Sequence, residues 1–419
     1  MHLACSECGA AQHVDTLFCD ACGGLLAFAL DPSAPGGAAL RRTFAERRLS
    51  NDPLDTSGVW RFRELLPAIA PEHVVSLHEN VVPVYDSCHG AEYARSSRVS
   101  YLHLGMNPTA SFKDAGMTVA ISHAKSRGAG VAVCASTGNT AASMAAYAAR
   151  AGISALVLVP AGGISEAKMA QTLDYGATVA AIDGDFDRAL ELVRGLDPAR
   201  VAIVNSVNPY RIEGQKCAAF ALLEARDWRA PDWLILPGGN LGNTSAFGKA
   251  FREAHALGLI DRVPRIAVVQ AAGAAPFARV FREGGELVPV RAETSATAIK
   301  IGAPASWRKA LAEVHASNGT VLAVSDEAIA DARAIVGRDG VGCEPASAAS
   351  LAGLLALCEN GTIGSAEDVV LVLTGHVLKD GAYAARYHTS GARFANPIHA
   401  TPTAETLRAL IDEVTAVRA

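Results

Sequence analysis

Lys113 is the residue of this chain whose surroundings most strongly indicate covalent chemistry. It lies in the run Asn107-Pro-Thr-Ala-Ser-Phe-Lys-Asp-Ala-Gly116, just before an apolar stretch, Met117 to Ala124, in which we expect a buried helix. Burial disfavours the charged form of a lysine, and a neutral amine can form a Schiff base. A lysine near a helix start is more often an ordinary surface residue, so two further loops decide between these interpretations.

The second loop is Ala135-Ser-Thr-Gly-Asn-Thr-Ala-Ala-Ser143, which follows a β-type run (Val131 to Cys134) and precedes an alanine-rich helix expected from Ala141 to Ala151. Helix initiation needs one capping side chain. Hydroxyl groups and free backbone N–H groups at a helix start form an anion site, which suits an amino-acid carboxylate. This loop carries four side chains of the capping type, Ser136, Thr137, Asn139 and Thr140.

The third loop is Leu236-Pro-Gly-Gly-Asn-Leu-Gly-Asn243, between an expected strand, Trp233 to Leu236, and an expected helix, Thr244 to Ala256. Its glycines let backbone N–H groups converge on a phosphate. A glycine-rich turn alone is weak evidence, since many are only tight turns. A Schiff-base lysine, a carboxylate loop and a phosphate loop together call for pyridoxal 5′-phosphate.

These strings, with several others, resemble the threonine synthase family within the fold-type II, tryptophan-synthase-β-like pyridoxal-phosphate enzymes. The likeness runs from about residue 100 to 385. The string Asn-Ser-Val-Asn-Pro-Tyr-Arg-Ile-Glu-Gly-Gln-Lys at 205–216 favours threonine synthases over the neighbouring dehydratases and cysteine synthases. The other strings are Gln-Ala-Ala-Gly-Ala-Ala-Pro at 270–276, Pro-Ala-Ser-Trp at 304–307, Glu-Pro-Ala-Ser-Ala-Ala at 344–349 and Leu-Thr-Gly-His-Val-Leu-Lys-Asp at 373–380.

The resemblance implies an α/β fold of two domains with parallel or mixed sheets and the cofactor between them. Lys113 would carry the cofactor and move protons, and Asn139 would lie beside the cofactor's 3′-oxygen. Thr374, at the end of the last apolar strand, would hydrogen-bond the pyridine nitrogen without holding it protonated. His376 and Lys379 follow and are either catalytic or ordinary loop residues. The cofactor's phosphate would be held by Gly238, Gly239, Asn240, Leu241, Gly242 and Asn243.

The implied reaction converts O-phospho-L-homoserine and water to L-threonine and phosphate, which is the work of a carbon–oxygen lyase. Ser136, Thr137 and Thr140 suit the substrate carboxylate. Asn205, Ser206 and Arg211 suit its phosphate, because the planar guanidinium fork of arginine matches phosphate oxygens. Arg211 could instead lie on a helix surface and pair with Glu213.

The chain also departs from the family pattern. Most members have Glu-Gly-x-Thr-Pro-Leu where this chain has Glu79-Asn-Val-Val-Pro-Val84. The cofactor positions are intact, so a related replacement or elimination enzyme for another phosphorylated amino acid is the alternative. A non-catalytic binding protein is disfavoured by the intact Lys113 and Asn139. Further departures are Ala110 for a usual glycine, Ala303 for a frequent asparagine, Cys217 for a usual threonine and Val377 for a glycine.

Four of the nine cysteines indicate a metal site. Cys5, Cys8, Cys19 and Cys22 form two C-x-x-C pairs separated by ten residues, with Gly9 and Gly23 directly after the pairs. This is the spacing of a zinc ribbon, in which four thiolates close the site and leave no position for catalysis. Disulfides or free thiols are the alternatives. The other five cysteines are expected to be buried small hydrophobes.

Composition sets broad limits on the class of protein. The 419 residues suffice for two core-bearing domains and a small appendage, and the 50% hydrophobic content is typical of an α/β protein. The net charge of −5 gives no support to binding of nucleic acid or an anionic membrane. We expect no signal peptide and no membrane span. The expectation is a cytoplasmic enzyme that acts on a small molecule, and a homodimer.

Strands and helices are expected to alternate from about Tyr101 onward. We expect the domains to follow one another along the chain, with a small domain inserted in the large one. A helical arm is expected from Leu40 to Leu66. The expected strands are Val131–Cys134, Ala155–Val159, Thr178–Ile182, Val201–Val204, Trp233–Leu236, Ile266–Gln270 and Val369–Leu373. The expected parts are the zinc ribbon (1–28), a linker and N-terminal arm (29–66), a large catalytic domain (67–116 and 216–390), a small mobile domain (117–215) and a C-terminal tail helix (391–419).

Overall fold

The computed structural model describes residues 1–31, 33, 35–161, 166–183, 188, 192–193, 196, 200–396, 398–399 and 403–416. The chain divides into two compact units, Met1–Lys379 and Asp380–Ala419. The second unit contains α13 (Gly381–Thr389) and α14 (Ala404–Ala416). Pro32 and Ala34 of the expected linker, and 397, 400–402 and 417–419 of the expected tail, lie outside the described residues.

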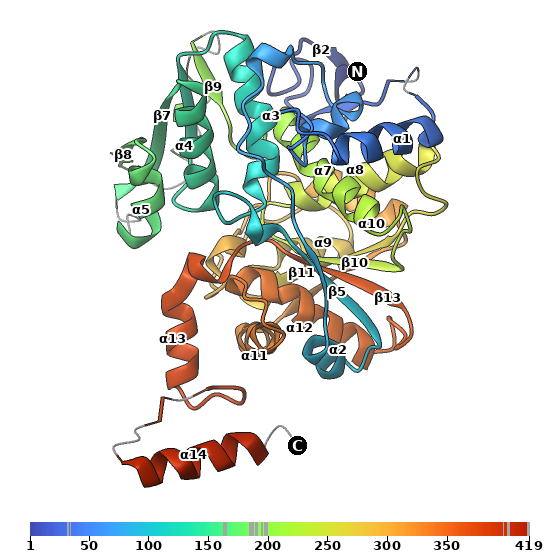
Figure 1. The fold of residues 1–419 in the computed structure, drawn as a ribbon. Helices are drawn as coiled ribbons and strands as arrows, with labels where there is room; N and C mark the ends of the chain where they lie inside the picture. The colour runs from blue at the N-terminus through green and yellow to red at the C-terminus, as the bar shows by residue number, and fades with distance from the viewer. Residues whose placement is uncertain are drawn as a thin grey trace. The chain divides into compact units, whose positions relative to one another are not determined.

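The larger sheet of the first unit is mixed. Its order is β12-β11-β10-β13-β5-β4, with every neighbouring pair parallel except β4 with β5. Figure 1 shows α11, α12 and α2 on one face and α7, α8 and α10 on the other. The strands are β4 (Val84–Asp86), β5 (Arg98–His103), β10 (Trp233–Pro237), β11 (Arg265–Ala271), β12 (Thr320–Val324) and β13 (Asp368–Leu373). The helices are α2 (His89–Ala94), α7 (Pro209–Ala225), α8 (Gly242–Ala256), α9 (Pro276–Glu283), α10 (Trp307–Ala316), α11 (Asp326–Arg338) and α12 (Pro345–Glu359).

The smaller sheet has the order β8-β7-β6-β9, and all its pairs are parallel. Its strands are β6 (Val131–Ala135), β7 (Ser154–Pro160), β8 (Thr178–Ile182) and β9 (Val201–Ile203), and its helices include α3 (Lys113–Ser126), α4 (Asn139–Ala151) and α5 (Glu166–Asp174). Short 3-10 helices are η1 (Trp60–Leu65), η2 (Pro71–His73), η3 (Leu104–Met106), η5 (Ala272–Ala274), η6 (Thr297–Ile299) and η7 (Val377–Asp380). The predicted α/β class with two parallel or mixed sheets is confirmed.

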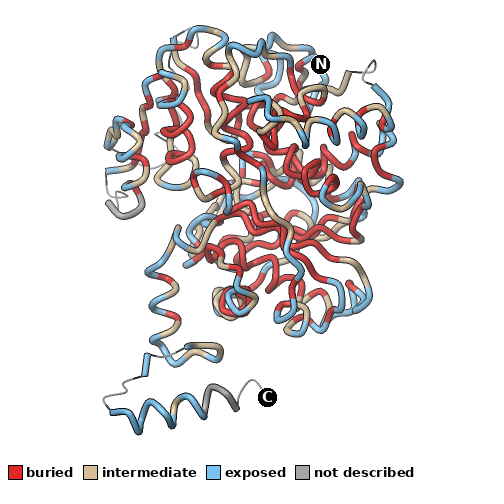
Figure 2. Tube along the Cα trace, in the orientation of Figure 1, coloured by how far each residue is buried: buried red, intermediate tan, exposed pale blue. Residues whose placement is uncertain are grey.

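Several of the strands that the sequence predicted are buried on both faces. β10 and the last five residues of β13 are buried throughout, as expected of parallel strands covered by helices (Figure 2). All seven predicted strands are present, with bounds that differ by at most one residue at either end. In the larger sheet the sequence missed β4, β5 and β12. β5 carries Arg, Ser, Tyr and His among its apolar residues, and a short apolar run such as β12 cannot be told from helix by its pattern.

The expected continuous helical arm from Leu40 to Leu66 is wrong in its middle. Helix α1 (Gly37–Arg48) ends early, and η1 begins only at Trp60. Between them the chain turns, because the Ser50 and Asp52 side chains accept hydrogen bonds from backbone N–H groups two residues ahead. Pro53 follows and cannot donate to a helix.

Helices α3 and α7 pack very closely, which brings their first turns together. Glycine makes this possible: a Cβ on Gly214 would lie 1.9 Å from the Ala115 carbonyl oxygen. A Cβ on Gly116 would lie 2.7 Å from the Arg211 carbonyl oxygen. The contact therefore fixes the start of α3, where Lys113 lies, against the start of α7, where Arg211 lies.

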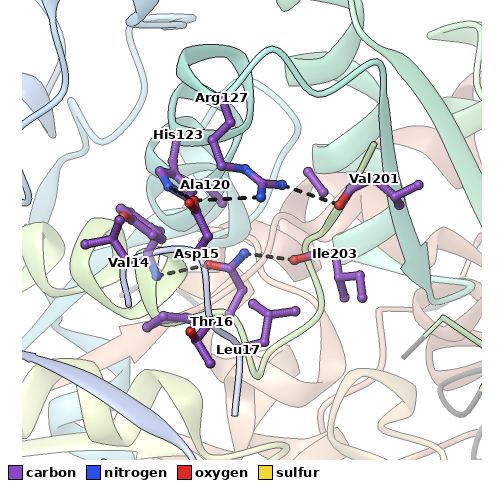
Figure 3. A pocket seen from close by; sticks show the side chains of 13 residues that line it. Val14, Asp15, Thr16, Leu17, Ala120, His123, Arg127, Val201 and Ile203 are labelled. Atoms are coloured by element: carbon purple, nitrogen blue, oxygen red, sulfur yellow. Dashed lines mark hydrogen bonds and ion pairs between the residues drawn. The ribbon is translucent and has the colours of Figure 1, made fainter. Parts of the chain in front are cut away.

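The N-terminal ribbon, residues 1–28, packs on the other end of α3. It is a three-stranded antiparallel sheet of β1 (His2–Cys5), β2 (Ala11–Gln12) and β3 (Leu26–Ala29). Asp15 reaches His123 of α3 at 3.2 Å and Arg127, directly after α3, at 3.7 Å, as Figure 3 shows. The His123 ring stacks on Tyr210 with centroids 3.7 Å apart, and Phe28 of β3 meets Tyr210 edge-on.

None of the described helices is both long enough and apolar enough to cross a membrane.

Candidate active site

Four helices begin close to the carboxyl ends of strands of the two sheets. Hydrogen bonds join some of the loops between these strands and helices. Helix α4 follows β6, α7 follows β9 and α8 follows β10, while α3 follows β5 after a short loop. Ligands of α/β proteins bind beyond the carboxyl ends of the strands. The Phe112 N–H donates to the Thr374 carbonyl oxygen (2.9 Å), which ties the Lys113 loop to the end of β13.

Lys113 is the first residue of α3 and is partly buried. Burial and the charge of Arg211 lower its pKa to about 7, and the charge of Glu344 opposes the shift. Its ammonium lies 3.9 Å from the centroid of the Phe112 ring. A large share of the amine is therefore neutral near pH 7, which is the form that reacts with a carbonyl group.

Asp114, directly after Lys113, holds the loop in place and was not singled out from the sequence. Its buried carboxylate accepts hydrogen bonds from the Thr109 hydroxyl (2.6 Å), the Thr109 N–H (2.7 Å) and the Ser143 hydroxyl of α4 (2.6 Å). Burial raises the pKa of Asp114 to about 6, against the effect of these donors. The bonds connect the reactive lysine to the helix that carries Asn139.

The glycine-rich loop before α8 has free donors that fit a phosphate. The helix starts after Leu241, at φ 64°, with no side chain capping it. The buried Asn243 amide and Thr244 hydroxyl have no hydrogen-bond partner among the described residues. A Cβ on Gly238 would lie 2.7 Å from Val268 Cγ1, so a larger residue would close this loop. A helix start with unmatched donors is an anion site.

Asn240 braces this loop and links it to the substrate side of the site. Its Oδ1 accepts from the Ala305 N–H (2.7 Å), and its Nδ2 donates to Ser206 Oγ (2.8 Å). The sequence assigned Asn240 to the cofactor phosphate and Ser206 to the substrate phosphate. The structure brings the two residues into contact, so the two predicted anion sites are neighbours.

The loop before α4 also lacks a capping side chain. Helix α4 begins at Asn139, and the Ser136 hydroxyl accepts from the Gly138 N–H (3.2 Å). Thr137 and Thr140 are half-buried in the same loop. The first N–H groups of α4 are thus left for an external anion, in keeping with the predicted carboxylate site.

Arg211 is a buried cation with unmatched donors. Only 1% of its surface is exposed, and its Nη1 donates to the Val204 carbonyl oxygen (3.2 Å). Its Nε and Nη2 have no partner within the described part of the chain. Glu213 binds Lys216 and Lys249 instead, so the alternative pairing with Arg211 is not observed. Burial lowers the pKa of Arg211 to about 10, and a buried unpaired charge is costly unless an anion joins it.

Asn205 is bound to the backbone. Its side-chain Oδ1 accepts from the Ala135 N–H (3.2 Å) and its Nδ2 donates to the Ala135 carbonyl oxygen (3.1 Å). These bonds join β9 to the end of β6. They leave limited capacity for an anion, and the role of Asn205 as a phosphate ligand stays a prediction.

Thr374 lies at the end of β13 in a hydrogen-bond network that the sequence did not reveal. Its hydroxyl oxygen lies 2.9 Å from Ser347 Oγ and 3.2 Å from Glu344 Oε1. The other carboxyl oxygen of Glu344 accepts from Asn139 Nδ2 (3.0 Å). Glu344 and Ser347 belong to the string at 344–349, and the only signal for Glu344 was a charged residue directly before an otherwise apolar helix.

His376 and Lys379 follow Thr374 and have protein partners. His376 Nδ1 accepts from the Leu378 N–H (3.3 Å), and its ring lies 6.1 Å from that of His103. The Lys379 ammonium donates to Gln171 of α5. These contacts favour the interpretation of both as loop residues.

Two departures from the family pattern lie where the backbone is left-handed. Asn80 and Ala110 replace glycines, and both have a φ of 63°. Asparagine tolerates this conformation, whereas alanine does so at a cost of roughly 1–2 kcal/mol. The loop that precedes Lys113 is therefore strained at Ala110.

The four N-terminal cysteines gather at one point. Their sulfur atoms all lie within 4.8 Å of one another, and neighbouring pairs are 3.5–3.6 Å apart. Four thiolates around Zn²⁺ at 2.3 Å would be about 3.8 Å apart. The N–H groups of Glu7 and Cys8 donate to Cys5 Sγ, and Gly9 and Gly23 have φ near 74°. No disulfide joins any of the four.

Comparison with known proteins agrees with this geometry. Residues 77–375 match the family model described as pyridoxal-phosphate dependent enzyme. A threonine synthase from Methanosarcina acetivorans is 41% identical over 90% of this chain and 92% of its own length. One from Mycobacterium bovis is 51% identical over 66% of this chain and 76% of its own. The crystal structure of threonine synthase from Escherichia coli has the same fold, with a TM-score of 0.67 at 19% identity, over 99% of this chain and 100% of that chain.

The two sheets, with a lysine and an uncapped glycine-rich helix start at the ends of their strands, define a fold-type II pyridoxal-phosphate enzyme. Such enzymes carry many chemistries on one fold. Within this class, the chain belongs to the threonine synthase family, a family of lyases.

Proposed function

We propose that this chain converts O-phospho-L-homoserine and water into L-threonine and inorganic phosphate. The observation that carries the substrate assignment is Arg211, a buried guanidinium that donates to the Val204 carbonyl oxygen and keeps two unmatched donor nitrogens. A phosphate oxygen pair matches a guanidinium fork, and a dianion balances a buried cation. The threonine synthases that this chain resembles over most of its length support the same reaction.

Pyridoxal 5′-phosphate, when bound, supplies the electron sink that makes the α- and β-protons of an amino acid removable. Lys113 would hold it, Asn139 and Thr374 would contact its ring, and the uncapped start of α8 would bind its phosphate. The free Asn243 amide and Thr244 hydroxyl support this fit.

Lys113 then serves as the base. Its Nζ takes the proton from the substrate α-carbon and afterwards one from the β-carbon, while the γ-phosphate leaves toward Arg211. One of these protons returns to the γ-carbon, which becomes a methyl group. Water adds at the β-carbon as hydroxide, its proton balances the released phosphate, and the other proton returns to the α-carbon. A lysine with a pKa of about 7 is suited to both acceptance and return of a proton near neutral pH.

The test is an assay with O-phospho-L-homoserine in which the amino-acid product is identified, run on wild type and Arg211→Ala. A charge-assisted contact contributes about 1.5–3 kcal/mol, so Arg211→Ala should lower kcat/KM roughly 10- to 150-fold. Arg211→Lys should recover only part, because a point charge cannot replace the fork. The cofactor absorption spectrum should stay unchanged in both variants.

Arg61 offers a matched control. It is also buried but pairs with Glu224 at 2.7 Å. Arg61→Ala should lower thermal stability without altering the KM for phosphorylated substrate. Near wild-type kinetics for Arg211→Ala would place the substrate phosphate elsewhere. Turnover of a different phosphorylated amino acid in preference to O-phospho-L-homoserine would establish the alternative enzyme.

We also propose that the four cysteines bind one structural zinc ion. Their sulfur spacing and the N–H groups donated to Cys5 support this assignment. Protein purified without added metal should contain about one zinc per chain, and Cys5→Ser with Cys8→Ser should remove it. We expect the melting temperature to fall before turnover does. Loss of turnover by chelation, with the fold intact, would contradict the structural role.

The segment 117–215 is proposed to move as a small domain during turnover. Its helix α5 reaches the rest of the site through Gln171, which contacts the Thr109 carbonyl oxygen and Lys379. Hydrogen exchange around Gln171 should slow when substrate binds. Equal exchange with and without substrate would argue against closure.

A further inference from the structure

Glu344 is a buried carboxyl that touches two residues assigned to the cofactor ring. Only 4% of its surface is exposed, and it lies directly before the first turn of α12. One oxygen meets Asn139 Nδ2 at 3.0 Å and the other meets Thr374 Oγ1 at 3.2 Å. Gly375 makes room for it, because a Cβ there would lie 2.4 Å from the carboxyl carbon of Glu344.

Ser347 fixes the direction of the hydrogen bonds around Thr374. Its hydroxyl oxygen accepts from the N–H groups of Thr374 (2.9 Å) and Gly375 (3.0 Å), which uses both of its acceptor positions. The Ser347 hydroxyl must therefore donate to Thr374 Oγ1, 2.9 Å away. Thr374 is left with one proton to give and one lone pair to share.

The protonation state of Glu344 decides where that proton goes. A charged carboxylate would attract the Thr374 hydroxyl proton, so the hydroxyl would turn only its lone pair to a pyridine nitrogen. A protonated carboxyl would instead donate to the free lone pair of Thr374. The Thr374 hydroxyl would then donate to an unprotonated pyridine nitrogen.

We propose that Glu344 is a positioning residue that stays protonated in the working enzyme, donates to Thr374 Oγ1 and so directs the Thr374 hydroxyl proton to the pyridine nitrogen. Its second oxygen accepts from Asn139, which aligns that amide as well. The pyridine nitrogen of the cofactor then stays unprotonated, so Glu344 keeps the cofactor ring a weak electron sink. This inference rests on the proposed roles of Thr374 and Asn139.

The surroundings of Glu344 carry few compensating charges. Burial raises its pKa, while the hydrogen bonds with Asn139 and Thr374 and then the charges of Lys379 and Lys113 lower it. Neither lysine forms an ion pair with it among the described residues. The Cys343 thiol beside it is buried, with a pKa raised by burial, and Arg333 donates to the Cys343 carbonyl oxygen instead (3.2 Å). His376 bridges Cys343 through the backbone. The start of α12 favours the charged form and works against the protonated one.

The test compares wild type with Glu344→Gln and Glu344→Leu, each prepared without cofactor and titrated with pyridoxal 5′-phosphate. Glutamine mimics the protonated carboxyl, because its amide can donate to Thr374 while its oxygen accepts from Asn139. Glu344→Gln should bind the cofactor within about threefold of wild type, whereas Glu344→Leu should bind at least about tenfold more weakly. The absorption spectrum of bound cofactor should coincide for wild type and Glu344→Gln from pH 6 to 8.

Glu79 is the matched control. It is also a buried glutamate, but Ser57, Ser76, Tyr147 and the Leu77 N–H all donate to it, so its site needs an acceptor only. Glu79→Gln should lower the melting temperature of the cofactor-free protein, while Glu344→Gln should leave it nearly unchanged. The change in melting temperature on substitution by glutamine thus distinguishes a buried carboxyl that is charged from one that is neutral.

A Glu344→Gln spectrum that departs from wild type, or binding as weak as in Glu344→Leu, would overturn the proposal. A spectral transition of wild type between pH 4 and 6 would also overturn it, because the carboxyl would then be charged at neutral pH; this measurement needs no variant to fold. If borohydride reduction labels a lysine other than Lys113, the proposed function itself fails, and the assignment of Glu344 fails with it.

Discussion

Lys113 and Lys216 lie on two helices that pack against each other, α3 and α7, but their neighbours differ. Lys216 is fully buried, and its ammonium lies 2.6 Å from Glu213 Oε2 and 2.8 Å from Glu253 Oε2. Lys249 completes this cluster. Lys113 has no ion pair in the part of the chain that the structure describes. The charge that affects its pKa most is that of another cation, Arg211.

The two lysines show that burial alone does not decide reactivity. Both lose hydration, which disfavours the charged form. At Lys216 two carboxylates overcome that effect and raise the pKa above its usual value. At Lys113 the charge of Glu344 opposes burial too weakly, and the pKa falls to about 7. The first lysine is locked as a cation that holds α7 to α8, and the second is free to exchange a proton.

Removal of Lys113 should have the largest effect on activity. Lys113→Ala should lower kcat/KM by roughly 10³-fold or more, because it removes the proposed base and the covalent anchor together. Its melting temperature without cofactor should not fall. Borohydride reduction followed by peptide mapping should find the pyridoxyl group on Lys113 in wild type and nowhere in the variant; a label retained on another lysine would refute the assignment.

Removal of Lys216 should act on stability instead. Lys216→Met leaves Glu213 and Glu253 with a single cation, and loss of one partner of a buried ion pair costs about 3–5 kcal/mol. We expect a lower denaturation midpoint, with the folded fraction still able to bind cofactor. The double change Lys216→Met and Glu253→Gln leaves one carboxylate, Glu213, paired with one cation, Lys249, and should recover part of the loss. A full loss of cofactor binding in folded Lys216→Met would give this lysine a direct role.

The pH dependence of the cofactor-free protein should sharpen the contrast. Below pH 7 the neutral fraction of Lys113, and hence its rate of capture of pyridoxal 5′-phosphate, should fall about tenfold per pH unit. Because its folded pKa lies below the unfolded value of about 10.4, its contribution to stability should rise from pH 7 to 10. Lys216 is shifted upward, so its contribution is complete below about pH 10.4 and is lost only at higher pH. A capture rate that does not vary between pH 5 and 7 would contradict the lowered pKa of Lys113.

The smallest expected effect concerns the loop before Lys113. Ala110 has a φ of 63°, so Ala110→Gly should relieve strain and stabilise the protein by about 1 kcal/mol or less, after the entropy cost of glycine. Thermal unfolding measures this gain. Ala120→Gly, in the regular interior of α3, is the control and should destabilise the protein. A loss of stability in Ala110→Gly would mean that Ala110 makes packing contacts worth more than its strain.

The sequence predicted those parts of the fold and site whose signal is local. Strands made of continuous apolar residues stand out, and the loops around Lys113, Asn139 and Gly238 stand out because small and hydroxyl residues gather at helix starts. The cysteine pairs were equally plain, and the structure brings their sulfur atoms together.

Partners far apart in the sequence could not be predicted. Asp114 binds Ser143, Glu344 binds Asn139, and Asn240 binds Ser206, in each case between two segments whose approach is set by the packing of the fold. The isolation of Arg211 is likewise a property of the folded chain, because its sequence neighbour Glu213 is engaged by Lys216 and Lys249. Charge near a residue in sequence did not indicate charge near it in space.

The contact between the ribbon and α3 has an evolutionary consequence. His123 and Tyr210 form a stacked aromatic pair that Phe28 and Asp15 cover, and the Lys309 ammonium donates to the Leu26 carbonyl oxygen of β3. A descendant that lost residues 1–28 would expose this pair and leave Lys309 without that acceptor. Gene truncation would therefore have to be accompanied by polar substitutions at 123 and 210. The ribbon and this surface should be inherited or lost together.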